Sequence, residues 1–272
     1  MVRGRAVCLL ALTALASFSS SVAKADAWPA CAATGESSIT IEAAGARDGA
    51  TLRLADGREV RLAGIVAAND LDGDRGAVER ASAALDRLVA GKRVLLYPSR
   101  GGNDRHGRIL AQVALADSDA PWVQGLLVAD GIVRVGPEAG EPACSEALIA
   151  KERAARAAGA GLWTEPRFSV ESASNLPALN AAIGRFALVE GTVVRVGETT
   201  SRTYIDFGRR YRESFTIVIP REARAAFRAA GIDLASLRGK RIRGRGVLFL
   251  SGGPAIEIRK PASIEIVQGG GA

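Results

Sequence analysis

The stretch "RDGATLRLADGREVRLAGI", residues 47–65, decides the fold of the first half of the chain. It contains two short runs, 51–54 and 59–62, in which apolar and polar residues alternate, separated by Asp56-Gly57. Alternation with a period of two is typical of a strand with one buried face, and Asp-Gly between two such runs is a strong hairpin signal. The stretch therefore predicts two paired strands.

The neighbouring segments extend this pattern into a barrel. A third strand-like run, "ITIEAAGA" (39–46), precedes the hairpin, and "AVERASAALDRLVAG" (77–91) has apolar residues at helical spacing before a terminal glycine. Two further strands, "KRVLLYPS" (92–99) and "ILAQVAL" (109–115), follow. Three strands, a helix and two more strands fit a five-stranded Greek-key barrel of the OB type.

The second half of the chain repeats this order. Residues 166–184 carry prolines, serines and asparagines and are interpreted as a linker, and strand-like runs resume at 185 with one helical segment among them. The predicted fold is mainly β with packed helices: one OB barrel over 26–165, then a second OB-like β-barrel over 185–268.

The first 25 residues have the pattern of a secretory signal peptide: two arginines, an apolar run and a small-x-small site ending at Ala25. The apolar run is too short for a permanent transmembrane helix, although an uncleaved anchor is the alternative. We expect an exported bacterial protein, periplasmic or extracellular, with no permanent membrane insertion. Export leaves Cys31 and Cys144, and an even count in an oxidising compartment favours a disulfide over two unrelated buried thiols.

The positive charge is unevenly distributed along the chain. The formal net charge is +7, but residues 26–184 carry a net −4 and residues 185–272 a net +8. A basic domain beside an acidic one predicts a polyanion partner for the basic domain.

Four segments in register give a specific resemblance to a known family. They are "DGATLRL…REVRLAGI", "DRHGRILAQV", "WVQGLLVADGIVRV" and "EALIAKERAARAAGAGLW". Together they resemble the staphylococcal-nuclease-like (thermonuclease, SNase-like) family over about residues 38–165. The resemblance implies an OB barrel with packed helices and calcium-dependent cleavage of phosphodiester bonds in DNA and RNA.

The resemblance also implies which residues should carry that chemistry, and three of them are replaced. In the family's turn motif Asp-Gly-Asp-Thr the second Asp binds the metal, and this chain has Ala50 there. Val66 stands at the second metal carboxylate and Asn69 at the glutamate that is the candidate base. Arg61 and Arg108 match the family's phosphate-binding arginines, and His106 replaces a tyrosine. Each arginine has an alternative role in a structural ion pair with Asp48 or Asp104.

The second half offers separate candidates for nucleic-acid binding. Aromatic residues interleaved with arginines suit a groove for single-stranded nucleic acid, and alternation on one strand face suits a positive stripe. With His106, these candidates are Arg202, Tyr204, Arg209, Arg210, Tyr211, Arg212, Arg241, Arg243 and Arg245. An ordinary barrel with solvated arginines is the alternative.

These observations favour a non-catalytic nuclease homologue, a pseudoenzyme without cofactor, that binds single-stranded nucleic acid or another polyanion. One alternative is a calcium- or magnesium-dependent nuclease with a metal site rearranged around Asp48, Asp70, Asp72 and Asp74. The other is a cell-envelope module that binds protein. Neither the ligand nor the oligomeric state follows from the sequence.

Overall fold

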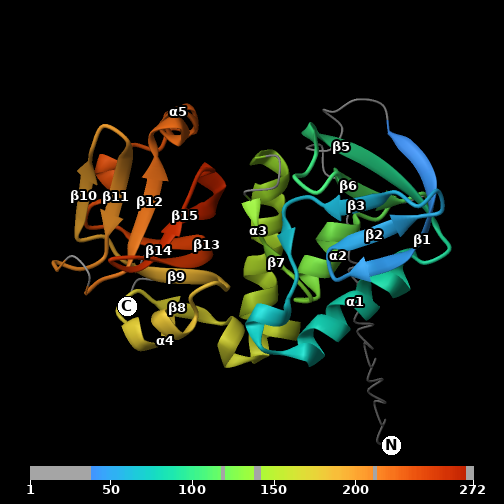
Figure 1. The fold of residues 1–272 in the computed structure, drawn as a ribbon, viewed down its shortest axis with the longest axis horizontal. Helices are drawn as coiled ribbons and strands as arrows, with labels where there is room; N and C mark the ends of the chain where they lie inside the picture. The colour runs from blue at the N-terminus through green and yellow to red at the C-terminus, as the bar shows by residue number, and fades with distance from the viewer. Residues whose placement is uncertain (1–37, 118–119, 138–141, 211–212, 268–272) are drawn as a thin grey trace, which may run out of the picture.

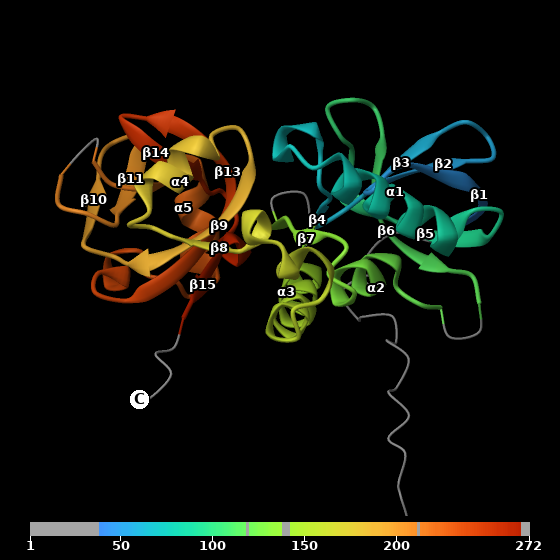
Figure 2. The same ribbon diagram turned by 90° about the horizontal axis from the view of Figure 1, so that it is seen from below.

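The structure is a computed structural model that describes residues 38–117, 120–137, 142–210 and 213–267. Two β-rich domains lie on either side of helix α3 (Pro142–Ala157), as Figure 1 shows. The view from below in Figure 2 also places α3 between them.

Five strands of the first domain close into a barrel in the order β1-β2-β3-β6-β5. They are β1 (Ile39–Asp48), β2 (Thr51–Leu54), β3 (Glu59–Leu62), β5 (Arg93–Asn103) and β6 (Ile109–Leu115). The first half of β1 pairs with β5 and its second half with β2, while β3 runs parallel to β6. The predicted OB barrel is confirmed by this strand order.

Helices cover the first barrel and complete its core. Helix α1 (Arg75–Val89) packs against β1, and Asp74 caps it by accepting a hydrogen bond of 3.0 Å from the Ala77 N–H. Helix α2 (Val123–Ala129) packs against β6 and α3, and the short strands β4 (Ile65–Val66) and β7 (Arg134–Val135) pair with each other. The 3₁₀ turns are η1 (Asp70–Asp72), η3 (Gly161–Thr164) and η4 (Pro166–Phe168).

The second domain repeats the pairing of the first. Its sheet has the order β10-β11-β12-β14-β13-β9-β8, with β15 also paired to β13. The bounds are β9 (Phe186–Thr192), β10 (Arg195–Glu198), β11 (Arg202–Asp206), β12 (Thr216–Pro220), β13 (Arg241–Ser251), β14 (Gly253–Glu257) and β15 (Ile264–Ile266). β9 and β10 together take the place of β1, because one pairs with β13 and the other with β11, and β12 runs parallel to β14 as β3 does to β6. The second domain is therefore OB-like.

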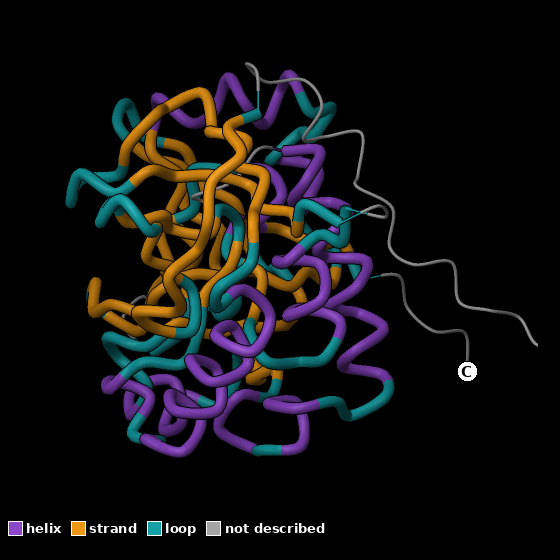
Figure 3. Tube along the Cα trace, turned by 90° about the vertical axis from the view of Figure 1, so that its right-hand side faces the viewer, coloured by secondary structure: helices purple, strands orange, loops and turns teal. Residues whose placement is uncertain are grey.

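Figure 3 shows the molecule from the side of the first domain, with the strands in orange and the helices that border them in purple. Helix α5 (Arg224–Ala229) separates β12 from β13, as α1 separates the third and fourth strands of the first barrel. The turns η5 (Arg221–Ala223), η6 (Ala235–Leu237) and η7 (Pro261–Ser263) complete the domain.

The segment 166–184 is folded, which differs from the predicted linker. Strand β8 (Val170–Ser172) pairs in parallel with β9, and helix α4 (Leu176–Ala181) places Leu179, which is fully buried, in the second core. Proline and asparagine mark a helix start here rather than an open chain, because Asn175 caps α4 and Pro177 lies in its first turn. The second domain thus includes residues from about 170 onward.

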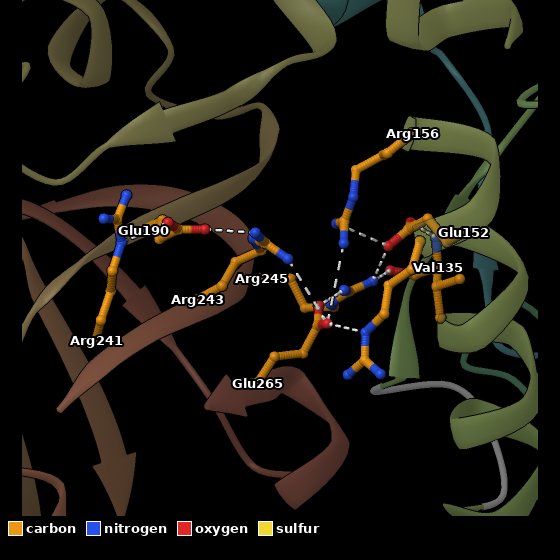
Figure 4. A network of polar contacts seen from close by, with 9 residues as sticks. Val135, Glu152, Arg156, Glu190, Arg241, Arg243, Arg245 and Glu265 are labelled. Atoms are coloured by element: carbon orange, nitrogen blue, oxygen red, sulfur yellow. Dashed lines mark hydrogen bonds and ion pairs between the residues drawn. The ribbon is translucent and has the colours of Figure 1, made fainter. Parts of the chain in front are cut away.

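The two domains are joined by a network of buried charges (Figure 4). Its centre is Glu152 on α3, whose carboxylate accepts the Val135 N–H at 2.7 Å and lies 2.6 Å from Arg245 Nη1. Arg156 Nη1 lies 3.4 Å from the same carboxylate. The side chains of Glu152 and Arg245 are both fully buried. A strand of one domain and a helix of the other are thus held by a pair of opposite charges in the interior.

Glu265 on β15 extends the network. Its carboxylate contacts Arg245 and lies 2.8 Å from Arg153 Nε and 3.7 Å from Arg243 Nη1. Arg243 also pairs with Glu190 on β9. Burial alone would raise the pKa of Glu265, but the surrounding guanidinium groups, Arg245 first, hold that pKa below its ordinary value.

Removing one member of the central pair should cost much more than removing an exposed arginine of the same strand. We expect Arg245→Ala to lower the free energy of unfolding by about 3–5 kcal/mol, because it removes the nearest countercharge of the buried Glu152 carboxylate and leaves only Arg156, at 3.4 Å. Arg241→Ala is the matched control: its side chain is 62% exposed and pairs with Glu190 at 2.7 Å, so its loss should cost at most about 1 kcal/mol. Urea unfolding at neutral pH measures both, and equal losses would contradict the central role of Arg245.

The depressed pKa of Glu265 predicts sensitivity to acid. A carboxylate with a lowered folded-state pKa stabilises the fold above its unfolded pKa, about 4.3, and this contribution disappears as the pH falls through the lower folded value. Urea unfolding between neutral pH and about pH 3 should therefore show a loss of stability in the acid range that is smaller in Glu265→Gln. Parallel pH profiles for the two proteins would show that Glu265 is not a source of the acid dependence.

Candidate phosphate-binding site

The turn from β1 to β2 has a methyl group at its centre. Asp48 Oδ1 accepts the Ala50 N–H at 2.8 Å, which closes the turn locally. Gly49 is required because a Cβ there would lie 2.5 Å from Ala81 Cβ on α1. Ala50 itself is fully buried and belongs to the barrel core. The position that carries a metal carboxylate in the resembled family is thus part of the apolar interior.

Arg61 is held by main-chain oxygens beside this turn. Arg61 is on β3, opposite Thr51 of β2. Its Nη1 and Nη2 donate to the carbonyls of Ala50 and Ile65, each at 3.0 Å. Burial is the main cause that lowers the pKa of Arg61, and the positive charge of Arg108 lowers this pKa further. The negative charge of Asp48 partly offsets the decrease. Arg61 and Arg108 therefore lie close enough to affect each other electrostatically, and the role of Arg61 as a phosphate ligand stays a prediction.

Arg108 is fixed by the hairpin that carries it. Its Nε and Nη2 lie 2.7 Å from Asp104 Oδ2, and its Nη1 lies 3.3 Å from Thr51 Oγ1. Burial would raise the pKa of Asp104, but hydrogen bonds from the Arg108 side chain and the His106 N–H lower it overall. The structural ion pair expected as the alternative for Arg108 is present, and its role as a phosphate ligand stays a prediction.

His106 lies at the exposed tip of the β5–β6 hairpin. Its N–H donates to Asp104 Oδ1 at 2.8 Å, and its Nε2 accepts from Arg105 Nε at 3.0 Å. The tip therefore presents the side chains of Arg105 and His106 to solvent, close in sequence to Arg108.

The residues at the family's metal positions do not fit calcium. Calcium takes six to eight oxygen ligands, mostly carboxylates and carbonyls. Ala50 and Val66 have no side-chain oxygen. Val66 also packs closely against Gly136: a Cβ atom added to Gly136 would lie 2.4 Å from Val66 Cγ2. Asn69 is exposed and its Oδ1 accepts the Leu71 N–H. Within the described ranges, no three His, Cys, Asp or Glu side chains are grouped so that they could hold a metal ion.

The loop aspartates considered for a rearranged metal site have structural contacts. Asp72 is buried, accepts the Asn69 N–H at 3.0 Å and lies 3.5 Å from Arg134 Nη2. Asp74 is the cap of α1, and Asp48 closes the β1–β2 turn. The side chain of Asp70 lies outside the described part of the structure.

The predicted positive stripe on β13 exists, but its last member, Arg245, faces the other domain. Arg241, Arg243 and Arg245 do share one face of the strand, as alternation requires. Arg245 is 1% exposed, however, so its assignment to a nucleic-acid-binding surface is wrong: α3 and Glu265 cover it. Arg243 is mostly buried and pairs with Glu190 and Glu265, which leaves Arg241 as the exposed member.

The other candidates of the second domain lie around β11. Arg202 and Arg209 are exposed, Arg210 is exposed and pairs with Glu213 at 3.1 Å, and Tyr204 is half-buried. Tyr211 and Arg212 lie outside the described residues. The role of all these candidates in nucleic-acid binding stays a prediction.

The cysteine and export predictions fall mostly on parts that the structure does not describe. Cys144 is fully buried on α3, whereas Cys31 and the predicted signal peptide (1–25) lie outside the described residues. The disulfide therefore stays a prediction. Over the described residues, no helix combines the length and apolarity needed to cross a membrane.

Arg134 at the domain junction was not among the residues predicted from the sequence. Arg134 is 1% exposed and joins the domains by donating from Nη1 to the Phe186 carbonyl at 2.7 Å. The only sequence signal was an arginine within the short extended run "IVRVG", where an apolar residue would be expected.

The strand order and the packed helices of the first domain define an OB barrel. Residues 59–165 match the family model described as staphylococcal nuclease homologue. The barrel begins at β1, ahead of the matched residues. The first domain is thus SNase-like. A search of curated proteins finds no match to the chain.

Proposed function

We propose that this protein is an exported, non-catalytic nuclease homologue that binds nucleic acid or another polyanion. The observation that carries the proposal is the buried methyl group of Ala50, which replaces a metal carboxylate while Arg61 and Arg108 remain beside it. Phosphodiester hydrolysis needs an activated water and charge neutralisation at phosphorus. Arginines can supply part of the second requirement, but no residue at the family positions supplies the first.

The binding surface in this proposal consists of the exposed basic residues of both domains. In the first domain these are Arg105, His106 and the partly exposed Arg108 at the β5–β6 hairpin. In the second domain they are Arg202 and Arg209, with Tyr204 available for stacking. We place the protein in the periplasm or outside the cell, and N-terminal sequencing of the mature protein checks cleavage after Ala25.

Restoring the replaced residues should create calcium-dependent cleavage that the natural protein lacks. The test compares wild type with Ala50→Asp, Val66→Asp, Asn69→Glu combined, using single-stranded DNA and RNA with calcium or with magnesium. We expect cleavage only by the variant, because it regains two metal carboxylates and a general base. Adding Arg108→Ala to the variant is the control and should abolish the gain, while circular dichroism verifies that each protein is folded. Metal-dependent cleavage by wild type would refute the non-catalytic proposal and favour the rearranged metal site.

Binding to single-stranded nucleic acid should weaken with salt and depend on the exposed arginines. Between about 50 and 200 mM salt the affinity should fall steeply, since each neutralised phosphate releases counterions. Arg202→Ala with Arg209→Ala should reduce both affinity and salt slope, whereas Arg87→Ala, an exposed arginine on α1, should change neither. Fluorescence anisotropy measures both quantities. Absent or salt-insensitive binding would contradict the proposal, and a protein captured from nuclease-treated lysate would then favour the envelope module.

A further inference from the structure

A small polar cavity of about 230 Å³ lies at the domain junction, apart from the Arg61 and Arg108 site. Asp72, Arg134 and Arg167 line it from the first domain and the turn that follows, and Glu171, Arg185 and Phe186 line it from the second. Three arginines therefore meet two carboxylates around one enclosed space. Because a ligand there would touch both domains, binding would stabilise their junction.

One edge of the Arg134 guanidinium group makes no hydrogen bond to the described residues, although it lies beside the Asp72 carboxylate. The rings of Phe168 and Phe186 cover its faces, with centroids 5.0 and 5.1 Å from Cζ. Nη1 donates to the Phe186 carbonyl at 2.7 Å. Nε and Nη2, which share the remaining edge, have no hydrogen-bond partner among the described residues, and Nη2 lies 3.5 Å from Asp72 Oδ1. Such an edge with two parallel N–H groups binds carboxylate or phosphate oxygens in a bidentate manner.

The charges around the cavity also favour an anion. Burial lowers the pKa of Arg134, and the positive charge of Arg185 lowers it further. The negative charges of Asp72 and Glu152 raise this pKa and offset part of the decrease. Arg185 Nη2 donates to the Ala181 carbonyl at 2.9 Å and retains further N–H groups. Arg167 Nη1 donates to the Gly73 carbonyl at 3.0 Å and its Nε lies 4.0 Å from Asp74 Oδ2, which leaves its Nη2 for a ligand. Asp72 is already partly satisfied by the Asn69 N–H. A bound anion would relieve the repulsion between the arginines and satisfy the free edge of Arg134.

We propose that this junction cavity binds a small tetrahedral oxyanion, either free phosphate or the terminal phosphate of a nucleotide. The volume is below the range of about 300–1,000 Å³ that holds drug-sized ligands, so the phosphate group itself is the part that the cavity encloses. The site uses none of the residues of the proposed nucleic-acid surface, so it goes beyond the proposed function.

The test is titration calorimetry of the full chain with inorganic phosphate, compared with chloride at equal ionic strength. It is made in an Arg108→Ala background, so that the first-barrel site does not contribute and failure of nucleic-acid binding leaves the result interpretable. We expect saturable binding of one phosphate per chain, and a higher melting temperature in phosphate than in chloride. A dinucleotide with and without a 5′-phosphate distinguishes the sources: binding only of the phosphorylated form identifies a terminal phosphate, and binding only of inorganic phosphate identifies the free ion.

Two variants and a matched control locate the binding. Arg185→Ala should weaken phosphate about tenfold, which corresponds to about 1.4 kcal/mol, and Arg167→Ala should weaken it in the same direction. Arg238→Ala, which removes an exposed arginine of the second domain away from the cavity lining, should leave the affinity unchanged. The proposal is overturned if phosphate and chloride behave alike, which would mean that the cavity holds only water. It is also overturned if Arg238→Ala weakens binding as much as Arg185→Ala does.

Discussion

The buried pair of Glu152 and Arg245 is the contact on which the arrangement of the two domains depends. It joins α3 of the SNase-like domain to β13 of the second domain, and neither side chain reaches solvent. Removing two charges from water is costly, and the cost is offset only when geometry and further hydrogen bonds are favourable. Here the Val135 N–H and Glu265 supply those additional contacts. Apolar packing permits small shifts of one domain along the other, whereas hydrogen-bonded ion pairs require a defined geometry. The network therefore determines the position of α3 relative to the second barrel.

This network changes the meaning of the uneven charge along the chain. A net −4 in residues 26–184 and a net +8 in residues 185–272 predict a polyanion partner for the second domain. Part of that positive charge is instead matched within the molecule, since Arg245 meets Glu152 of the other domain. Net charge counted along a sequence therefore overstates the charge available to a partner. The exposed arginines, Arg202 and Arg209 among them, are the residues on which a polyanion proposal can rest.

Local sequence patterns predicted the strands and helices of the fold. They could not predict the contacts between segments that are distant in the sequence. Alternation and the Asp56-Gly57 turn were sufficient for the first barrel, because strand period and turn chemistry are encoded in neighbouring residues. The same alternation correctly placed Arg241, Arg243 and Arg245 on one face of β13 but gave no information on what covers that face. Similarly, the prolines of 166–184 indicated a break in the chain, but β8 pairs with a later strand, with Val170 opposite Leu188, and the local sequence does not encode that pairing.

The environment of Arg61 shows why retention of an arginine is weak support for retention of a function. Its Nη1 and Nη2 donate to the main-chain carbonyls of Ala50 and Ile65, and these oxygens are present whatever side chain stands at position 50. Arg108 is likewise anchored by Asp104 and Thr51 within the barrel. A barrel without metal carboxylates would still be destabilised by losing either arginine, because the Ala50 and Ile65 carbonyls would lose Arg61 as a donor and Asp104 would lose its ion pair with Arg108. Contacts within the barrel are therefore sufficient to account for both arginines, and the proposal of a non-catalytic protein rests on the buried methyl group of Ala50 rather than on Arg61 and Arg108.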